Sequence, residues 1–289
     1  MPFRFTASET ACAERIIDIR SADAIAMPEL PEVETFKQYI ERTSLERPIA
    51  RLEVRNDTVI RGADRSALTE AVEGSELLSI RRRGKQLFLE LSKGGWLTWH
   101  FGMTGRPVSL RQEEEEPRFV RVLLAFEHGS LAFVDGRMLG HIGLTSSPER
   151  FIEEKRLGLD ALDITWEEFS STFGSARGAI KTALMDQHRV AGIGNLYSDE
   201  ILFQCRIDPR AEARFLSRSD MRCMHRTMRR VLNRAIAVGA DLDRLPSSYL
   251  LRHRSAGSPC PRCGSVVRSE TIGGRTAYFC PSCLDRTLF

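Results

Sequence analysis

Residues 27–35 read Met-Pro-Glu-Leu-Pro-Glu-Val-Glu-Thr, and this stretch joins a helix start to a candidate nucleophile. Pro31, with acidic residues in the turn that follows, predicts a helix over residues 31–42. If the chain began at Pro28, its secondary amine would be free, and a free α-amino group titrates near ~8. Such an amine can attack a sugar aldehyde carbon and form a Schiff base. In the sequence as it stands, residues 1–26 precede Pro28, and an internal proline has no amine to offer.

The composition is that of an ordinary globular protein. Its 289 residues are enough for two domains, and 42% are apolar while 28% are charged. No apolar run approaches the ~18 residues of a membrane span, and residues 1–26 lack the apolar core of a signal peptide. We therefore expect a cytoplasmic, nucleoid-associated monomer without membrane contact, in which residues 1–26 are disordered or an over-long assigned start.

The charges are distributed unevenly along the chain. Residues 205–289 hold 16 arginines, no lysine and 7 acidic residues, which gives +9, whereas residues 1–204 carry −6. Such asymmetry favours a basic C-terminal part that meets phosphates. The alternative is a solvated helix face, because arginine is common on exposed helices.

The hydrophobic pattern changes along the chain and predicts a multi-domain α+β fold. After the leading helix, period-two patterns predict a β-sandwich within residues 27–146, with strands at 49–55, 77–83, 86–91, 96–101, 119–126 and 130–134. A helical domain is predicted within residues 147–240, with helices at 166–173, 177–185, 195–203 and 220–238. A linker over 241–258 and a compact tail over 259–289 follow. The acidic run 113–116 is expected to be a solvated loop.

Four cysteines in the tail form a zinc-ribbon pattern. Two Cys-x-x-Cys pairs are separated by 16 residues, and their members are Cys260, Cys263, Cys280 and Cys283. Four thiolates close a tetrahedral site, so one structural zinc ion per chain is predicted, and its binding supports a segment too short for its own core. A redox-active pair is the weaker alternative. The three scattered cysteines are expected to be buried or inert thiols, and the odd count argues against a disulfide scaffold; they are Cys12, Cys205 and Cys223.

From Met27 to about Cys283 the chain resembles the formamidopyrimidine-DNA glycosylase/endonuclease VIII family, which excises oxidised bases from DNA and cuts the strand. The resemblance rests on the 27–35 motif, a Gly-Lys turn at Lys85, a Gly-x-Gly-Asn stretch and the ribbon, in family order. It implies a helix–two-turns–helix domain over 147–240 and damaged double-stranded DNA as the partner. Leu30 is typical of the formamidopyrimidine branch.

The resemblance implies catalytic roles for residues around the helix start. Pro28 would be the nucleophile, Glu29 the acid/base carboxyl and Glu32 a supporting acid. A carboxyl held near ~6–7 by partial burial can exchange protons in such a reaction. The simpler alternative for either glutamate is to begin the helix.

Three further residues are implied as ligands of the DNA backbone. Lys85 and Arg275 would grip phosphates and support catalysis, and an arginine fork suits a phosphate. Asn195 follows a Gly-rich turn at a predicted helix start, where backbone amides bind anions. The alternatives are an exposed turn lysine, an exposed hairpin arginine and a helix-capping asparagine.

Enzymes that act on a base must extrude it from the stack at a cost of about a few kcal/mol, and wedge side chains that fill the vacated place offset this cost. The resemblance assigns this role to Met103, Arg137 and Leu139, although the family usually has Phe at the last position. Leucine can wedge but stacks poorly. By composition alone, Met103 and Leu139 fit a core equally well.

Three functions remain open at this point. The first is a formamidopyrimidine and 8-oxoguanine glycosylase with strand cleavage by β,δ-elimination. The short 239–259 segment favours a looser, endonuclease VIII-type preference for oxidised pyrimidines or hydantoins. An internal Pro28 favours a catalytically inactive protein that binds damaged DNA.

Overall fold

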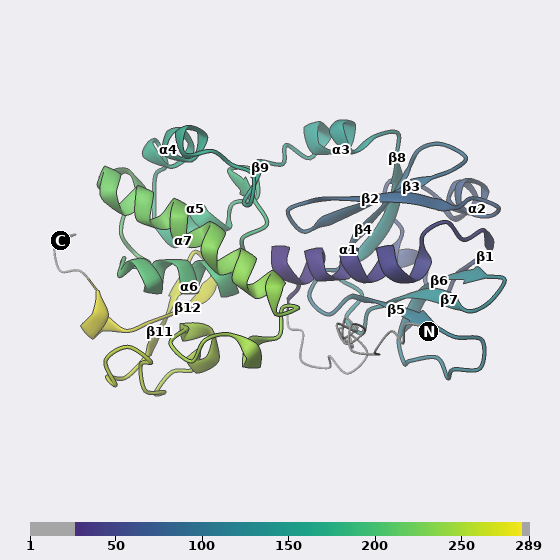
Figure 1. The fold of residues 1–289 in the computed structure, drawn as a ribbon. Helices are drawn as coiled ribbons and strands as arrows, with labels where there is room; N and C mark the ends of the chain where they lie inside the picture. The colour runs from purple at the N-terminus through teal and green to yellow at the C-terminus, as the bar shows by residue number, and fades with distance from the viewer. Residues whose placement is uncertain (1–26, 285–289) are drawn as a thin grey trace, which may run out of the picture.

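The computed structural model describes residues 27–284, and it has a sheet-rich N-terminal half and a helical C-terminal half (Figure 1). The predicted α+β class is confirmed. The predictions for residues 1–26, including Cys12, lie outside the described residues. Within residues 27–284, no helix is long and apolar enough to cross a membrane.

Helix α1, Leu30–Ser44, follows directly from the Pro-Glu sequence; it runs along the sheet-rich half, and its N-terminal end lies at the boundary with the helical half (Figure 1). Its apolar residues recur at helical spacing, and Val33, Phe36 and Ile40 are fully buried. The helix contacts strands of the sheet half and helix α7 of the helical half. It therefore fixes the N-terminal motif at the boundary of the two halves.

Two antiparallel four-stranded sheets pack face to face. One has the order β1-β6-β7-β5, from Ile49–Val54, Val120–Phe126, Ser130–Val134 and Arg106–Leu110. The other has the order β2-β3-β4-β8, from Leu77–Arg83, Gln86–Leu91, Trp96–His100 and His141–Thr145. One buried cluster draws on both sheets, including Leu89, Trp99, Leu124 and Phe133. Alternation of inward and outward residues builds this core, as in other β-sandwiches.

The sequence pattern missed two strands and two short helices in this half. Strand β5 contains Pro107 and lies at a sheet edge, where a missing N–H is tolerated. Strand β8 contains Gly143, where a Cβ would collide with the Arg61 carbonyl oxygen. Helices α2, Arg65–Val72, and α3, Pro148–Glu154, are capped by Asp64 and Ser147. Periodicity alone does not resolve elements of this length.

The helical half surrounds a second apolar core. Its helices are α4 (Trp166–Gly174), α5 (Ile180–Met185), α6 (Asn195–Cys205) and α7 (Arg218–Ala237). Short parallel strands β9, Leu159–Asp160, and β10, Val190–Ala191, pair beside them. The ribbon hairpin is β11, Arg268–Ile272, with β12, Arg275–Phe279. Short 3-10 turns cover Asp57–Val59, Ala213–Phe215, Leu242–Arg244, Leu250–His253 and Pro281–Cys283.

The expectation of inert thiols is wrong for two cysteines. Cys205, at the end of α6, and Cys223, in α7, form a disulfide with their Cα atoms 5.9 Å apart. The sequence gives no sign of it, because only the packing of α6 against α7 brings these residues together.

The segment predicted as a linker packs tightly against the helical core. Leu245, Tyr249 and Leu250 are buried, and the Leu251 amide donates to the Glu200 carboxylate (2.9 Å). The segment packs because its few apolar side chains are buried, although most of the residues around them are polar.

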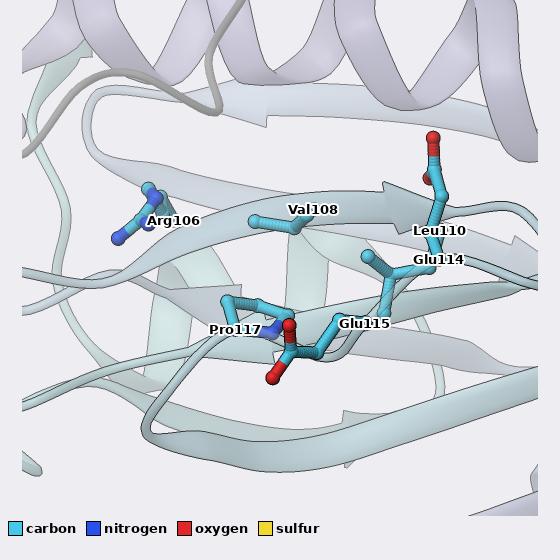
Figure 2. A pocket seen from close by; sticks show the side chains of 6 residues that line it. All are labelled: Arg106, Val108, Leu110, Glu114, Glu115 and Pro117. Carbon is cyan, nitrogen blue, oxygen red and sulfur yellow. The ribbon is translucent and has the colours of Figure 1, made fainter.

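The loop that holds the acidic run folds back over an outer face of the sandwich. Figure 2 shows Val108 of β5 opposite Pro117 and Glu115 of this loop, around a hollow of about 280 Å³. The glutamates remain on the surface side, as expected for a solvated acidic loop.

Candidate active site

The Glu29 carboxylate lies on the N-terminus of α6, across the boundary between the two halves. It accepts hydrogen bonds from the amides of Gly194 (2.5 Å) and Leu196 (2.7 Å). Amides at a helix N-terminus bind anions, and the positive end of the helix dipole strengthens this binding. Glu29 is 1% exposed, so the contact fixes α1 against α6.

Lys85 lies beside this carboxylate in the turn between β2 and β3. A Cβ built on Gly194 would stand 2.5 Å from both the Lys85 Nζ and a Glu29 carboxylate oxygen. The turn is anchored because the Gly84 amide donates to Asp160 (2.7 Å) and Arg82 donates to Glu34 (2.7 Å). An ammonium group and a carboxylate thus both face Gly194, where no side chain fits.

Pro28 is buried and immediately precedes Glu29, the N-terminal capping residue of α1. The Met27 amide donates to the Met103 carbonyl (2.7 Å), and the Leu30 amide donates to the Gly192 carbonyl (3.0 Å). Pro28 is thereby held between the loop after β4 and the Gly-rich turn before α6. In this chain its nitrogen is part of a peptide bond.

Glu32 is buried behind Glu29. It accepts from the Glu29 amide (2.9 Å) and from the Tyr197 hydroxyl (2.8 Å). Burial, and then the neighbouring Glu29 charge, raise the pKa of Glu32 to about 7. Burial also raises the pKa of Tyr197. A proton on Glu32 thus relieves the repulsion between two adjacent carboxylates.

The raised pKa makes the stability of the fold depend on pH. Glu32 holds its proton up to about pH 7 when folded but only to its ordinary value of 4.5 when unfolded. Its stabilising contribution, about 3 kcal/mol, is present below pH 4.5 and is lost as the pH rises through 7. We expect Glu32→Gln to remove this loss, so that its free energy of unfolding falls less between pH 5 and 8 than that of the unsubstituted protein.

Urea denaturation at both pH values measures this difference. Glu41→Gln on the same helix is the matched control, because Glu41 pairs with Lys37 at the surface (3.1 Å). Parallel pH profiles for the unsubstituted chain and Glu32→Gln would show that Glu32 does not carry the titration.

A cavity of about 460 Å³ opens beside Lys85 between the two halves, and sequence reasoning missed its histidines. His100 and His141 are stacked with ring centres 4.9 Å apart. Burial, and then Lys85 and Arg61, lower the pKa of His100 to about 4, so the ring is neutral at pH 7. Its Nδ1 accepts from the Gly102 amide (3.1 Å), which leaves the ring hydrogen on Nε2. In the sequence, the only sign that His100 belongs to the site is its position just before the Gly102-Met103 turn.

Asn195 is the first residue of α6, and Gly194 is the capping residue. The Asn195 side chain therefore does not cap the helix, and its Oδ1 is buried without a hydrogen-bond partner among the described residues. Its carbonyl lies 3.5 Å from an Arg254 nitrogen, which lies equally close to the Thr276 carbonyl. Arg275, next to Thr276, is thus brought near Asn195 and is exposed on the ribbon hairpin.

Asp199 joins the ribbon to the helical half. It accepts from Lys181 of α5 (2.5 Å), from Arg254 (2.9 Å) and from the Tyr278 amide of β12 (3.2 Å). The side chains of Lys181 and Asp199 are fully buried. Removal of one partner would leave an uncompensated buried charge and strongly destabilise the fold. These hydrogen bonds of Asp199 hold the hairpin that carries Arg275 against the helical half.

The three predicted wedge residues lie on adjacent loops. Residues 135–140, the wedge loop, follow β7, and Thr104 beside Met103 donates to Asp135 of this loop (2.6 Å). Leu139 is 45% exposed and Arg137 is also exposed, so the alternative of a core role for Leu139 is wrong. Met103 is half-buried.

The four tail cysteines fit a tetrahedral zinc ion. Their sulfur atoms lie within 4.8 Å of one another, with separations of 3.3, 3.6 and 3.7 Å for three pairs. A Zn–S bond of about 2.3 Å implies sulfur separations of about 3.8 Å in a tetrahedron. Four thiolates leave no open position, so this ion is structural.

Family models match three consecutive parts of the chain. These are the formamidopyrimidine-DNA glycosylase N-terminal domain (residues 27–142), the H2TH domain of the same protein (residues 157–246) and a zinc finger found in FPG and IleRS (residues 257–286). The helix–two-turns–helix element and the ribbon are therefore both recognised in the C-terminal half.

Relatives and solved structures agree with these matches. Formamidopyrimidine-DNA glycosylases of Desulfitobacterium hafniense and Thermus thermophilus are 33% and 34% identical, over 89% of this chain and 99% and 98% of theirs. A mutant of the Lactococcus lactis FPG, in complex with a Fapy-dG containing DNA, superposes with a TM-score of 0.82. A MutM complex with carbocyclic 8-oxo-G DNA gives the same score; each is 27% identical and covers 90% of this chain and 100% of its own. This chain belongs to the formamidopyrimidine-DNA glycosylase family.

Proposed function

We propose that this protein is a bifunctional DNA glycosylase and AP lyase that removes formamidopyrimidines and 8-oxoguanine during base excision repair. In this proposal it acts as a monomer on duplex DNA of the nucleoid, and the free amine of Pro28 is the nucleophile. The observation that carries the proposal is the Glu29 carboxylate, fixed by the α6 amides, beside Lys85 and next to Pro28. The relatives that carry this name and the solved complexes with Fapy-dG and 8-oxo-G DNA support the substrate class.

The proposed reaction proceeds through a covalent bond between the protein and the sugar. The Pro28 nitrogen bonds to C1′, and the glycosidic electron pair leaves with the base, which takes up a proton. Glu29 takes up the proton that the attacking Pro28 nitrogen loses and passes it to the sugar ring oxygen, and the ring opens to an iminium. Loss of a 2′ proton then expels the 3′ phosphate, and a second elimination expels the 5′ phosphate. Water hydrolyses the iminium and frees Pro28.

The phosphates around the extruded nucleotide are held, in this proposal, by Lys85, Asn195 and Arg275. A phosphate oxygen accepts hydrogen bonds, so in this proposal the Asn195 Nδ2 amide donates to it, while the buried Oδ1 has no partner among residues 27–284. His100 adds a neutral Nε2–H donor in the cavity beside Lys85. Donors fixed before the DNA binds lose little entropy on binding.

A binding protein without lyase activity is the second candidate, and one observation favours it. With residues 1–26 attached, the nitrogen of Pro28 lies in a peptide bond and cannot form an imine. This candidate predicts salt-sensitive binding to duplexes without strand cleavage.

Two forms of the chain separate the candidates: one that begins at Pro28 and one that contains residues 1–289. Each is incubated with duplexes that contain 8-oxoguanine, a formamidopyrimidine or thymine glycol. We expect cleavage of the first two substrates by the form that begins at Pro28 and none by the full chain. Binding without cleavage by both forms would favour the second candidate, and preferential cleavage at thymine glycol would place the chain with endonuclease VIII-type enzymes.

Gly194→Ala tests the geometry around Glu29 in the form that begins at Pro28. The added Cβ would stand 2.5 Å from Glu29 and Lys85 and must displace at least one of them. We expect single-turnover excision to fall by about 10- to 100-fold, because a displacement of about 1 Å has effects of this size. Gly174→Ala is the matched control, since a Cβ at Gly174 meets nothing within 4 Å. Equal excision rates for the two variants would show that the close approach at Gly194 is unimportant.

A further inference from the structure

Exposed apolar side chains gather around the wedge loop. Phe119, Met138 and Leu139 are 50%, 41% and 45% exposed, and they are half of the large apolar side chains that residues 27–284 expose strongly. Phe119 comes from a different part of the chain, just before β6. Its carbonyl accepts from the Asp135 amide (3.1 Å), and its ring lies 3.5 Å from the place of a Cβ on Gly136. The ring therefore packs on the backbone of the wedge loop.

The backbone at Phe119 is held in an unfavourable conformation. Its φ is +68°, and Met138 in the facing loop has φ +53°. Left-handed conformations are rare for large non-glycine residues, and they cluster at ligand sites. Phe119 and Met138 are two of seven non-glycine residues with positive φ among residues 27–284, and both present large apolar side chains to solvent.

Two arginines flank the Phe119 ring. The guanidinium carbons of Arg118 and Arg121 lie 5.1 and 5.6 Å from its centre. Arg121 also donates to the carbonyls of Asp135 (2.7 Å) and Gly136 (3.3 Å), which ties β6 to the wedge loop. Both guanidinium groups lie over the ring. Proteins that bind unpaired bases combine aromatic side chains, on which the bases stack, with cations that follow the phosphates and arginines that add cation–π contacts.

The position of Phe119 relative to Pro28 indicates which base it meets. A series of hydrogen bonds connects the two residues: the Met27 amide donates to the Met103 carbonyl, the Thr104 hydroxyl to the Asp135 carboxylate, and the Asp135 amide to the Phe119 carbonyl. In the proposed function Pro28 marks the sugar of the extruded nucleotide, and these hydrogen bonds connect Phe119 to it through the wedge loop. If the wedge loop fills the place of the extruded nucleotide, a ring packed on this loop lies next to the bases that remain in the duplex.

We propose that Phe119 stacks on the unpaired base that the undamaged strand keeps after its partner is extruded. It supplies the aromatic surface that Leu139 lacks. This inference rests on the proposed function, because it requires an extruded nucleotide. Phe119 is a specificity residue in this role and takes no part in bond cleavage.

The test uses a duplex with a tetrahydrofuran abasic analogue opposite 2-aminopurine, whose fluorescence reports stacking. We expect Phe119→Ala to bind this duplex about tenfold more weakly, the range for loss of one base–aromatic stack, and to lose the fluorescence change on binding. Phe119→Trp should restore both signals, whereas Phe119→Leu, which keeps apolar bulk without a ring, should not.

Phe215→Ala is the matched control, because Phe215 is 67% exposed and has an arginine over its ring but lies in the helical half. Wild-type affinity and fluorescence in Phe119→Ala would overturn the proposal, as would equal losses in Phe119→Ala and Phe215→Ala. Strand cleavage by the unsubstituted form that begins at Pro28 is measured separately. Cleavage with no effect of Phe119→Ala would leave the proposed function intact and remove only the stacking role. Binding that depends on Phe119, without any cleavage, would support the stacking role and contradict the proposed function.

Discussion

Pro28→Gly, in the form of the chain that begins at residue 28, is expected to slow base excision by about 10³-fold. The substitution replaces a rigid secondary amine by a flexible primary amine, so both the nucleophile and its alignment with C1′ change. Glu29 remains in place, because its hydrogen bonds with the Gly194 and Leu196 amides do not involve residue 28. Single-turnover excision from an 8-oxoguanine duplex measures the effect.

Two controls accompany Pro28→Gly. Its affinity for a duplex with an abasic analogue should be unchanged, which shows that the fold and the DNA grip are intact. Pro31→Ala changes a proline of the same motif within the first turn of α1 and leaves the terminal amine intact. An excision rate in Pro28→Gly equal to that of Pro31→Ala would contradict the role of Pro28 as nucleophile.

Cys280→Ser is expected to release zinc and unfold the ribbon. Structural zinc sites contribute about 10–16 kcal/mol of binding free energy, and one lost thiolate opens the closed site. Arg275 is on the hairpin between the cysteine pairs, so affinity for damaged duplex should fall strongly as well. The zinc content per chain and limited proteolysis after residue 257 measure the two effects.

Cys223→Ser is the matched control for Cys280→Ser, because Cys223 lies in α7 and pairs with Cys205 rather than with the ribbon. It should retain one zinc ion per chain. Full zinc content in Cys280→Ser would mean that three thiolates suffice or that the metal is bound elsewhere.

Local patterns in the sequence predicted much of the fold. The bounds of β2 and β3 match the prediction, because alternating residues and a Gly-Lys turn lie next to each other in sequence. The helix over 31–42 and the cysteine cluster were likewise encoded by short spacings. Strands β5 and β8 were missed because Pro107 and Gly143 usually interrupt strands. Their place in the sheet depends on neighbouring strands that the local sequence does not reveal.

The arrangement of the candidate site could not be predicted from spacing. Glu29 meets the α6 amides across 165 residues of sequence, and the family resemblance gave it a proton-transfer role without this contact. Phe119 was treated as a strand residue, because nothing in its sequence neighbourhood reveals that it packs on Gly136. His100 and His141 are also distant in sequence, and the pairing of β4 with β8 brings them together. Contacts of this kind depend on topology, which periodicity does not specify.

Borohydride trapping of the natively expressed protein on an oxidised-base duplex, followed by mapping of the cross-linked peptide, tests the central claim most directly. Borohydride reduces the iminium between the amine and C1′ to a stable bond, so the adduct marks the nucleophile. We expect an adduct at Pro28, on a chain that begins at that residue. An adduct at Lys85, or no adduct while the duplex remains bound, would contradict the proposed mechanism.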